Sequence, residues 1–352
     1  MQYSYCTLFD KNYLDKGLLT LRSLKAVNQE ARIYALAMDD DCEKVLHCES
    51  GIYVISLGDL LDDKLIAVRE NRTKAEFCWT CTASLILYVL EKYDESICTY
   101  IDADMFFYSN PDILVNEMIN AGKSVLIIEH RIKNDFMGRL MLKNAGRFCV
   151  EFNTFMNTDA SLKVLKDWRN KTIEHCSSDS SDGKPKGDQS YLEDWPFQYD
   201  NIYISTNIGA GIAPWNLDRY SVFIIDDKPY VAFDGNGKHR VLFYHFHNLQ
   251  YIEKHKVNIN VFTVRGAVDK RTVYYFYYRY LLEIDRIKNE IQQNYGFLPL
   301  LTYHPGIVRK YNHNRKYYIK KLFSKELAVS IRSRYISYLL RKKYAGDDIL
   351  VF

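Results

Sequence analysis

An apolar run at residues 97–107 carries two carboxylates and constrains this chain more than any other stretch. Its β-branched and aromatic residues predict a buried parallel strand, with Asp102 and Asp104 at or just past its C-terminal end. Open α/β sheets bind ligands at this edge. One small residue separates the two aspartates, so both carboxylates can face one hard cation such as Mg²⁺ or Mn²⁺.

A cation held by two carboxylates keeps open coordination positions, which the oxygens of a diphosphate can fill. The pair therefore favours nucleotide-sugar chemistry, in which the cation neutralises a departing diphosphate. The alternative is structural. Asn110-Pro111-Asp112 is typical of a helix start, and an aspartate pair can belong to a strand-to-helix turn that only caps the next helix.

Further strands and helices are predicted by alternation, by helical spacing of leucines and by polar breakers. The predicted strands are 3–9, 32–37, 53–56, 124–129, 147–157 and a last core strand at 241–246. The predicted helices are 13–25, 75–93, 112–121, 159–175 and 274–293. A β-turn-α opening of this kind is typical of the nucleotide-binding half of a doubly wound sheet. The Gly-x-Gly-x-x-Gly fingerprint is absent, which argues against a dinucleotide oxidoreductase.

Five segments in order resemble GT-A glycosyltransferases, especially glycosyltransferase family 8 and related bacterial nucleotide-diphospho-sugar transferases. They are Cys6-Thr7-Leu8-Phe9-Asp10 with Tyr13, Tyr100-Ile101-Asp102-Ala103-Asp104 with Asn110-Pro111, Phe152-Asn153-Thr154-Phe155-Met156-Asn157, Gly187-Asp188-Gln189-Ser190-Tyr191-Leu192, and Phe243-Tyr244-His245-Phe246. The resemblance implies an α/β fold of the GT-A type, a Rossmann-like, mixed and mainly parallel sheet flanked by helices.

The resemblance also assigns residues that bind the donor. The base and ribose are expected beside Thr7, Phe9, Asp10 and Tyr13, and a basic residue is expected against the diphosphate or sugar, with Arg69, Arg72 and Lys74 as candidates. For Asp10 and Tyr13 the alternative is that they cap and pack the first turn of the following helix. For each basic residue the alternative is a solvated helix start.

The same resemblance implies the reaction centre. Asp188 and Gln189 are expected beside the anomeric carbon, although both residues can instead cap a short helix. Asn153 is expected to contact the sugar or the acceptor, but this chain has Thr-Phe where the family has Ala-Gly after the asparagine. His245 is expected to complete a Mn²⁺ or Mg²⁺ site with the two aspartates at 102 and 104.

Composition sets the scale of the protein. A 352-residue chain that is 47% hydrophobic can form one large α/β domain and an appendage. We expect a catalytic domain at 1–265 and a helical, basic and aromatic C-terminal region at 266–352. No leader-like apolar region and no run of about 18 apolar residues is present, so a cytoplasmic location is expected. The eight cysteines are scattered and predict buried reduced thiols, with a redox or zinc role for Cys78-Trp79-Thr80-Cys81 as the alternative.

The segment after Pro305 is rich in lysine and arginine, with apolar residues between the charges at helical spacing. Such a helix is typical of attachment to an anionic membrane surface, here the inner face of the membrane. Nucleic-acid binding and packing on the catalytic domain are the alternatives, and no nucleic-acid partner is expected.

The resulting functional hypothesis is a metal-dependent glycosyltransferase. In this hypothesis it transfers a sugar from a nucleotide diphosphate sugar to a saccharide or lipid-linked glycan acceptor. A UDP-sugar is the first candidate for the donor. Retention of the anomeric configuration is implied by the resemblance alone. An inverting enzyme would need a carboxylate base, for which Asp188 is the candidate. Other classes remain as alternatives, namely a sugar-nucleotide nucleotidyltransferase and a non-catalytic basic surface-binding protein.

Overall fold

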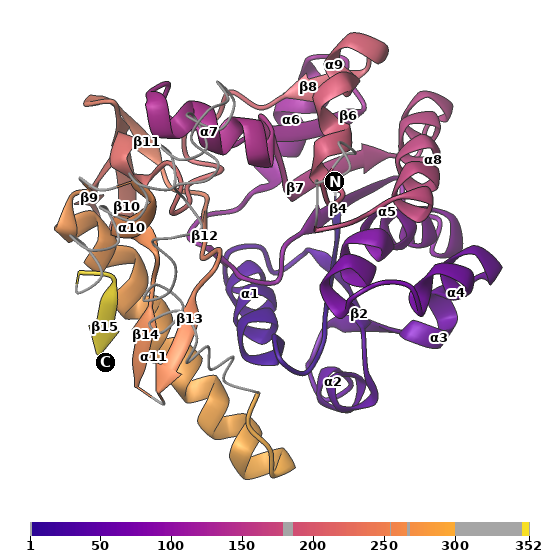
Figure 1. The fold of residues 1–352 in the computed structure, drawn as a ribbon, viewed down its shortest axis with the longest axis horizontal. Coiled ribbons are helices and arrows are strands. Elements are labelled where there is room, and N and C mark those ends of the chain that lie inside the picture. Colours follow the sequence, from indigo (N-terminus) through magenta and orange to yellow (C-terminus); the bar gives the residue numbers. More distant parts are fainter. Residues whose placement is uncertain (1, 179–185, 254, 266–267, 300–346, 352) are drawn as a thin grey trace, which may run out of the picture.

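The computed structural model describes residues 2–178, 186–253, 255–265, 268–299 and 347–351. Within these residues a seven-stranded sheet forms the centre of the protein (Figure 1). In spatial order its strands are β3 (Ile52–Ser56), β2 (Arg32–Ala37), β1 (Ser4–Phe9), β4 (Ile97–Ile101), β7 (Phe148–Met156), β6 (Val125–Glu129) and β8 (Ile202–Ile204). All neighbours are parallel except β7, which is antiparallel to both β4 and β6. The expected α/β class with a mixed, mainly parallel sheet is confirmed.

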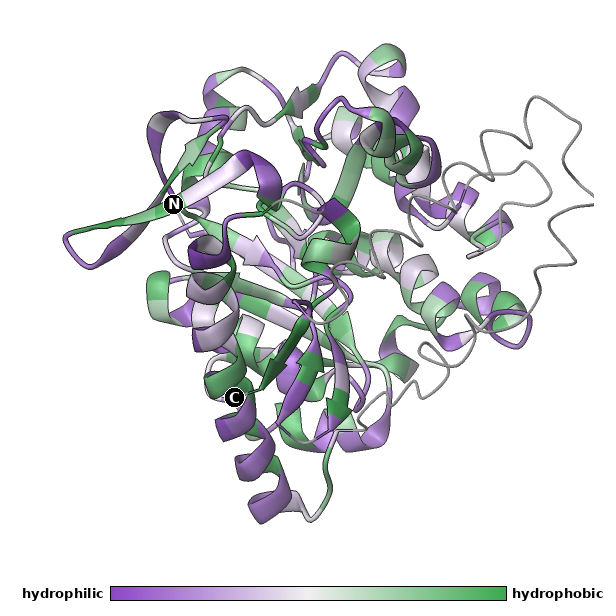
Figure 2. Ribbon diagram, turned by 60° about the vertical axis from the view of Figure 1, so that its left-hand side comes forward, coloured by the Kyte–Doolittle hydropathy of each residue, from purple (hydrophilic) through white to green (hydrophobic). Residues whose placement is uncertain are grey.

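Helices cover both faces of this sheet. They are α1 (Leu14–Val27), α2 (Asp40–Leu46), α3 (Leu57–Leu60), α4 (Asp63–Arg69), α5 (Lys74–Lys92), α6 (Asp112–Asn120), α7 (Phe136–Ala145), α8 (Asp159–Glu174), α9 (Trp195–Gln198), α10 (Val261–Arg265) and α11 (Lys270–Tyr295), with 3-10 turns η1 (Gln189–Asp194) and η2 (Leu217–Arg219). One large apolar core joins α1, α6 and α11 to one face, and a second joins α5 and α8 to the other. Figure 2 shows hydrophobic residues in the central strands and hydrophilic ones on outer helical turns.

The predicted apolar run at 97–107 forms two strands. It continues from β4 through Asp102 and Asp104 into β5 (Met105–Phe107), which leaves the central sheet. β5 pairs antiparallel with β12 (Phe243–His245) in a two-stranded sheet. The expected last core strand at 241–246 is therefore shorter than predicted and lies outside the central sheet, because its partner is β5 and not β4.

Two further small sheets were not predicted. One is a meander of β9 (Tyr220–Ile225), β10 (Lys228–Phe233) and β11 (Asn236–Arg240). The other joins β13 (Gln250–Glu253), β14 (Lys256–Asn258) and β15 (Ile349–Val351), so residues near the C-terminus pair with a strand that comes after β12.

Helix α11 begins and ends with strong local signals. The Asp269 carboxylate accepts hydrogen bonds from the backbone N–H groups of Arg271 and Thr272, both at 3.2 Å. Gly296, with φ +76°, terminates the helix in the left-handed conformation that glycine adopts freely. The apolar stripe of α11 is buried in the same core as α1. The first part of the region 266–352 thus packs on the sheet domain, and the boundary at 265 stays a sequence prediction.

The basic tract after Pro305 lies outside the described residues up to 346, and its membrane role also stays a prediction. Among the described residues no helix combines the length and the apolarity needed to cross a membrane.

Candidate active site at the end of β4

The turn that carries Asp102 and Asp104 is fixed by hydrogen bonds from three directions. The backbone N–H of Asp102 donates to the carbonyl of Glu151 in β7 at 3.1 Å, and that of Phe246 donates to the carbonyl of Asp104 at 2.8 Å. From α1, the hydroxyl of Thr20 lies 2.8 Å from the carbonyl oxygens on either side of Asp104 and accepts the N–H of Met105 at 3.0 Å. Helix, sheet and β12 together therefore set the directions of the two carboxylates.

Strand register brings His245 to these carboxylates. β12 pairs with β5 so that His245 lies opposite Met105, the residue after Asp104. The imidazole Nε2 is 3.0 Å from Oδ1 of Asp104 and 3.7 Å from Oδ2 of Asp102. His245 and Asp104 are buried, whereas the side chain of Asp102 is 30% exposed and opens the cluster to solvent.

This cluster fits a divalent cation by the chemistry of its donors. One oxygen of each aspartate and Nε2 of His245 lie within 4.8 Å of one another. Two carboxylates and one neutral imidazole suit Mn²⁺, and the carboxylates alone suit Mg²⁺. The three predicted metal ligands are thus brought together, although they are separated by up to 143 residues in the sequence (245 − 102).

The charges of the cluster are strongly coupled. Burial and the nearby charges of Asp104 and Glu151 raise the pKa of Asp102 to about 6, against the opposing effect of His245. Burial acts in the same way on Asp104, but the imidazole beside it outweighs burial and lowers the pKa of that carboxyl group. Burial disfavours the imidazolium of His245, yet the carboxylate of Asp104 outweighs it and raises the pKa of the ring. The site attracts positive charge.

Asp188 is close enough to Asp102 for the charges of the two carboxylates to interact. It is 7% exposed, and burial together with the charge of Asp102 raises its pKa to about 7. The Asp188 carboxylate makes no capping hydrogen bond of the usual kind to η1, the next element in the chain. Hydrogen bonds from its own backbone, from the hydroxyl of Thr82 and from the backbone of Gln189 act against burial and lower its pKa. The backbone carbonyl accepts the indole N–H of Trp168 at 3.0 Å, which fixes the residue against α8.

Gln189 and Asn153 are placed differently. The amide Nε2 of Gln189 donates to the carbonyl of Ala145 at 2.7 Å. Asn153 is fully buried in β7 opposite Tyr100, and neither atom of its amide has a hydrogen-bond partner among the described residues. Phe155, the second of the two residues that depart from the Ala-Gly pattern of the similar transferases, packs against Trp168 and fills the core there.

The residues expected at the base and ribose lie at and just beyond the end of β1. Thr7 is buried. The ring of Phe9 packs directly on Gly17 of α1, where any larger side chain would clash, since a Cβ on Gly17 would lie 2.5 Å from the ring. The Asp10 carboxylate accepts hydrogen bonds from the backbone and the side-chain amide of Asn12 at 3.0 and 2.7 Å. Tyr13 is 40% exposed and precedes α1 directly.

The basic candidates separate into two groups. Arg69 and Lys74 are exposed. The charges of Lys74 and Asp10 both act on the pKa of the Cys78 thiol, so both side chains lie near Cys78. The guanidinium of Arg72, in the turn before α5, donates to the carbonyl oxygens of Thr172 and Ile173 in α8 at 2.7 and 2.5 Å and also to the hydroxyl of Thr80, and therefore connects α5 to α8.

The sequence analysis missed two residues beside the carboxylate pair. Lys16 is 4% exposed, its Nζ lies 4.1 Å from the ring centre of Tyr13, and its charge helps to lower the pKa of Asp104. Glu151 is fully buried and places Oε2 2.6 Å from Nδ1 of His245. The sequence feature that could have indicated Lys16 is a lysine in the first helical turn after the first strand. For Glu151 the feature is a charged residue inside an otherwise apolar strand.

The Cys-x-x-Cys segment belongs to the helix interior of α5. Burial raises the pKa of the Cys78 thiol to about 12 and raises that of Cys81 as well. Both cysteines are free. Such thiols are protonated and poorly nucleophilic at neutral pH. The expectation that all eight cysteines are buried is wrong for Cys48, which is exposed, and Cys78 is half-buried, whereas the other six are buried.

Comparison with known proteins gives relatives without an assigned activity. No family model matches the chain. It is 27% identical to the uncharacterized protein YfnD of Bacillus subtilis over 306 residues, which cover 84% of this chain and 95% of YfnD. It is 29% identical to YfnF of the same organism over 266 residues, which cover 73% of this chain and 85% of YfnF.

Solved structures that are similar include two transferases. The galactosyltransferase LgtC in complex with donor and acceptor sugar analogues is 12% identical, with a TM-score of 0.48, and the match covers 87% of this chain and 99% of LgtC. Mouse xyloside xylosyltransferase 1 in its apo form is 12% identical, with a TM-score of 0.44, and the match covers 70% of this chain and 98% of that protein.

Proposed function

We propose that this protein is a metal-dependent glycosyltransferase that transfers a sugar from a nucleotide diphosphate sugar, with a UDP-sugar as the first candidate, to a saccharide or lipid-linked acceptor. The observation that carries the proposal is the convergence of Asp102, Asp104 and His245 at the carboxyl end of β4. Ligands of open α/β sheets bind at this edge. The order of the five motif segments that resemble GT-A glycosyltransferases supports the same function.

The metal ligands in this proposal are Asp102, Asp104 and Nε2 of His245. A bound Mn²⁺ or Mg²⁺ supplies charge neutralisation for the diphosphate leaving group. Lys16 offers a second positive charge beside Asp104, because its ammonium group is buried and its hydrogen bond to the carbonyl of Leu249 is long, at 3.5 Å. A buried ammonium with so weak a partner suits an anionic ligand such as a diphosphate.

Each of the remaining residues is proposed to contact one part of the donor. Asp10 and Tyr13, at the end of β1, are proposed to bind the ribose and to stack on the base, with Thr7 and Phe9 shaping the floor beneath them. Asp188 is proposed to lie beside the anomeric carbon, where a carboxylate stabilises developing positive charge, with Gln189 and Asn153 as further polar groups. Arg69 and Lys74 remain the proposed contacts to the diphosphate or sugar from α4 and α5.

The decisive experiment measures donor hydrolysis and donor binding. We expect the purified chain to hydrolyse at least one UDP-sugar with Mn²⁺ and to lose this activity with a chelator. Asp102→Asn and Asp104→Asn should each reduce metal-dependent donor binding, measured by calorimetry, at least tenfold, because each substitution removes one anionic ligand. Asp227→Asn, at an exposed turn residue with φ +58° that asparagine tolerates, is the matched control and should bind the donor normally.

Unchanged donor affinity in both aspartate variants would contradict the proposal. The stereochemical outcome is tested separately, because NMR of the first product formed from a UDP-sugar distinguishes retention from inversion. We propose retention, with Asp188 as the electrostatic partner of the reacting carbon. An inverted product would instead support Asp188 as the general base.

A further inference from the structure

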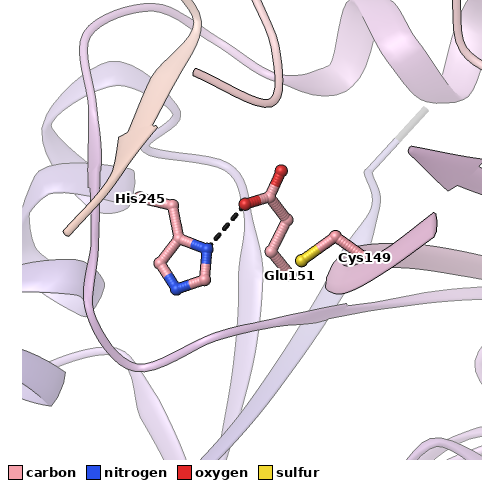
Figure 3. A group of neighbouring side chains, drawn as sticks. All are labelled: Cys149, Glu151 and His245. Carbon is pink, nitrogen blue, oxygen red and sulfur yellow. Dashed lines mark hydrogen bonds and ion pairs between the residues drawn. The ribbon is translucent and has the colours of Figure 1, made fainter. Parts of the chain in front are cut away.

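Glu151 lies directly behind His245, on the side of the ring that faces away from the two aspartates. Its Oε2 is 2.6 Å from Nδ1 of His245, and both side chains are almost fully buried. Figure 3 shows this contact and shows the other ring nitrogen pointing away from Glu151. That nitrogen, Nε2, lies 3.0 Å from Oδ1 of Asp104.

The contact determines which ring nitrogen can bind a cation. A carboxylate only accepts hydrogen bonds, so the nitrogen at 2.6 Å from Glu151 must carry a proton. By the same argument Nε2, at 3.0 Å from Oδ1 of Asp104, also carries a proton while no cation is bound. A cation held by Asp102 and Asp104 would replace the proton on Nε2, because that nitrogen is on their side of the ring, and the proton on Nδ1 would stay with Glu151. We propose that Glu151 is a positioning residue that fixes His245 as a metal ligand through Nε2 and increases the basicity of that nitrogen. This inference rests on the proposed metal site.

The main chain of Glu151 acts on the same site. Its carbonyl accepts the N–H of Asp102 at 3.1 Å, so one residue of β7 is bonded to two of the three proposed ligands. A change in the side chain therefore alters the orientation of His245, while the backbone hydrogen bond to Asp102 is kept. This separates the positioning role from the integrity of the turn between β4 and β5.

Space and charge around Glu151 support this role. Its second oxygen, Oε1, is buried and has no hydrogen-bond partner among the described residues. The contact of Oε2 with His245 is therefore the hydrogen bond that this carboxylate makes through its side chain among the described residues. Gly211 packs beside this carboxylate: its φ of +67° favours glycine, and a Cβ there would come within 2.8 Å of Ile128 and 3.3 Å of Oε1.

A direct metal site made of Cys149, Glu151 and His245 is the alternative arrangement, since one donor atom of each lies within the same 4.8 Å. All three side chains are buried there, and a cation would have to bind Nδ1 in place of the proton. The aspartate side of the ring is the one that is open to solvent through Asp102. The geometry therefore favours Glu151 as a hydrogen-bond acceptor over Glu151 as a ligand.

The test measures binding of Mn²⁺ alone to the full chain by calorimetry, without any nucleotide sugar. Glu151→Gln should bind Mn²⁺ roughly 10- to 100-fold more weakly than the wild type, the usual cost of losing such a partner of a metal-bound histidine. Glu151→Asp, which keeps the charge on a shorter side chain, should bind with intermediate affinity and serves if the glutamine variant does not fold.

The matched control is Glu95→Gln. Glu95 is equally buried and accepts the hydroxyl of Tyr34 at 2.5 Å, but it lies just before β4, at the opposite end from Asp102. This variant should lose stability and keep the wild-type affinity for Mn²⁺. A general effect of removing a buried carboxylate would weaken metal binding in both variants and would overturn the proposal.

A spectroscopic measurement completes the test. In protein labelled with ¹⁵N-histidine and saturated with Zn²⁺, a diamagnetic cation that binds imidazole, His245 should show the Nδ1-protonated tautomer in the wild type and a mixture of tautomers in Glu151→Gln. Equal Mn²⁺ affinity in the wild type and both Glu151 variants would overturn the positioning role and leave the proposed function intact. Absence of Mn²⁺ binding by the wild type would overturn the metal site and this inference together.

Discussion

Glu76 collects an unusual number of hydrogen bonds for a carboxylate near a helix start. Its two oxygens accept from the backbone N–H and the hydroxyl of Thr73 at 2.9 and 2.8 Å, and from those of Ser178 at 2.7 and 2.9 Å. These bonds, first from Ser178 and then from Thr73, lower the pKa of Glu76 to about 2. The residue caps α5 and also holds Ser178, in the segment that leads toward Asp188.

Glu76→Gln should lower the free energy of unfolding by about 2 kcal/mol at pH 7, at the upper end of the range for a lost cap. Because the folded state lowers the pKa of this carboxyl group from 4.5 to about 2, its ionisation stabilises the protein above pH 4.5. This stabilisation is lost as the pH falls from 4.5 toward 2. Urea unfolding at several pH values should therefore show the difference between variant and wild type shrinking over that interval.

Glu91→Gln is the control for this prediction, because Glu91 is an exposed residue of the same helix paired with Lys166. It should change the stability by less than about 0.5 kcal/mol. A constant difference between Glu76→Gln and the wild type from pH 7 to pH 3 would show that the ionised carboxylate does not stabilise the fold.

At the level of elements, α11 is the helix that closes the core over α1. Phe276 is fully buried, and its ring stacks on the ring of Tyr244, the residue before His245. The two ring centres are 4.5 Å apart. One turn further on, Tyr280 stacks on Phe246. The helix therefore packs against the residues on both sides of the proposed histidine ligand, and its contribution to the site is structural support of β12.

Phe276→Ala should destabilise the whole protein by about 3–5 kcal/mol, the usual cost of a large aromatic truncation in a core. The effect should appear in the tryptophan fluorescence of Trp168 and Trp195, which lie in the other core across the sheet. Tyr274→Ala removes a ring that is 54% exposed on the same helix and should leave the unfolding midpoint almost unchanged. Loss of α11 helicity at a lower urea concentration than the fluorescence change would contradict a single cooperative unit.

For the whole molecule, the C-terminal region contributes to the fold at both of its described ends. α11 completes one core, and β15 pairs with β14 through Leu350 opposite Val257. The positive charge of the chain after Pro305 lies between these two parts of the sequence. A peripheral contact with an anionic membrane is therefore proposed for the intervening tract, and the elements on either side of it belong to the folded protein.

Deletion of residues 305–346, which keeps β15, should reduce sedimentation with vesicles that contain anionic lipid, because several lysines and arginines are removed. Hydrolysis of the donor sugar should be spared, since the deletion leaves α11, β14 and β15 in place. Vesicles of neutral lipid are the control and should bind neither protein. Equal binding of both proteins to anionic vesicles would remove the membrane proposal.

Local pattern in the sequence was sufficient for the sheet class, for the longer helices and six of the central strands, and for the carboxylate pair, whereas short helices such as α2, α4 and α7 and the small sheets were missed. β1, β2 and β4 are short apolar runs that end at polar residues, and alternation or β-branching makes such runs visible without a partner. Asp102 and Asp104 are neighbours in the chain, so their shared direction is a local property. His245 was assigned from the resemblance of its segment, and the register of β12 on β5 is what brings it beside Asp104.

Only the tertiary structure decided the contacts that depend on pairing between distant strands. The direction of β7, the departure of β5 from the central sheet and the contact of Glu151 with His245 depend on residues far apart in the sequence, and no local pattern encodes such register. The burial of Lys16 likewise depends on residues beyond β12. Local preference thus determined which residues form strands and which carry charge, and packing determined which charges meet.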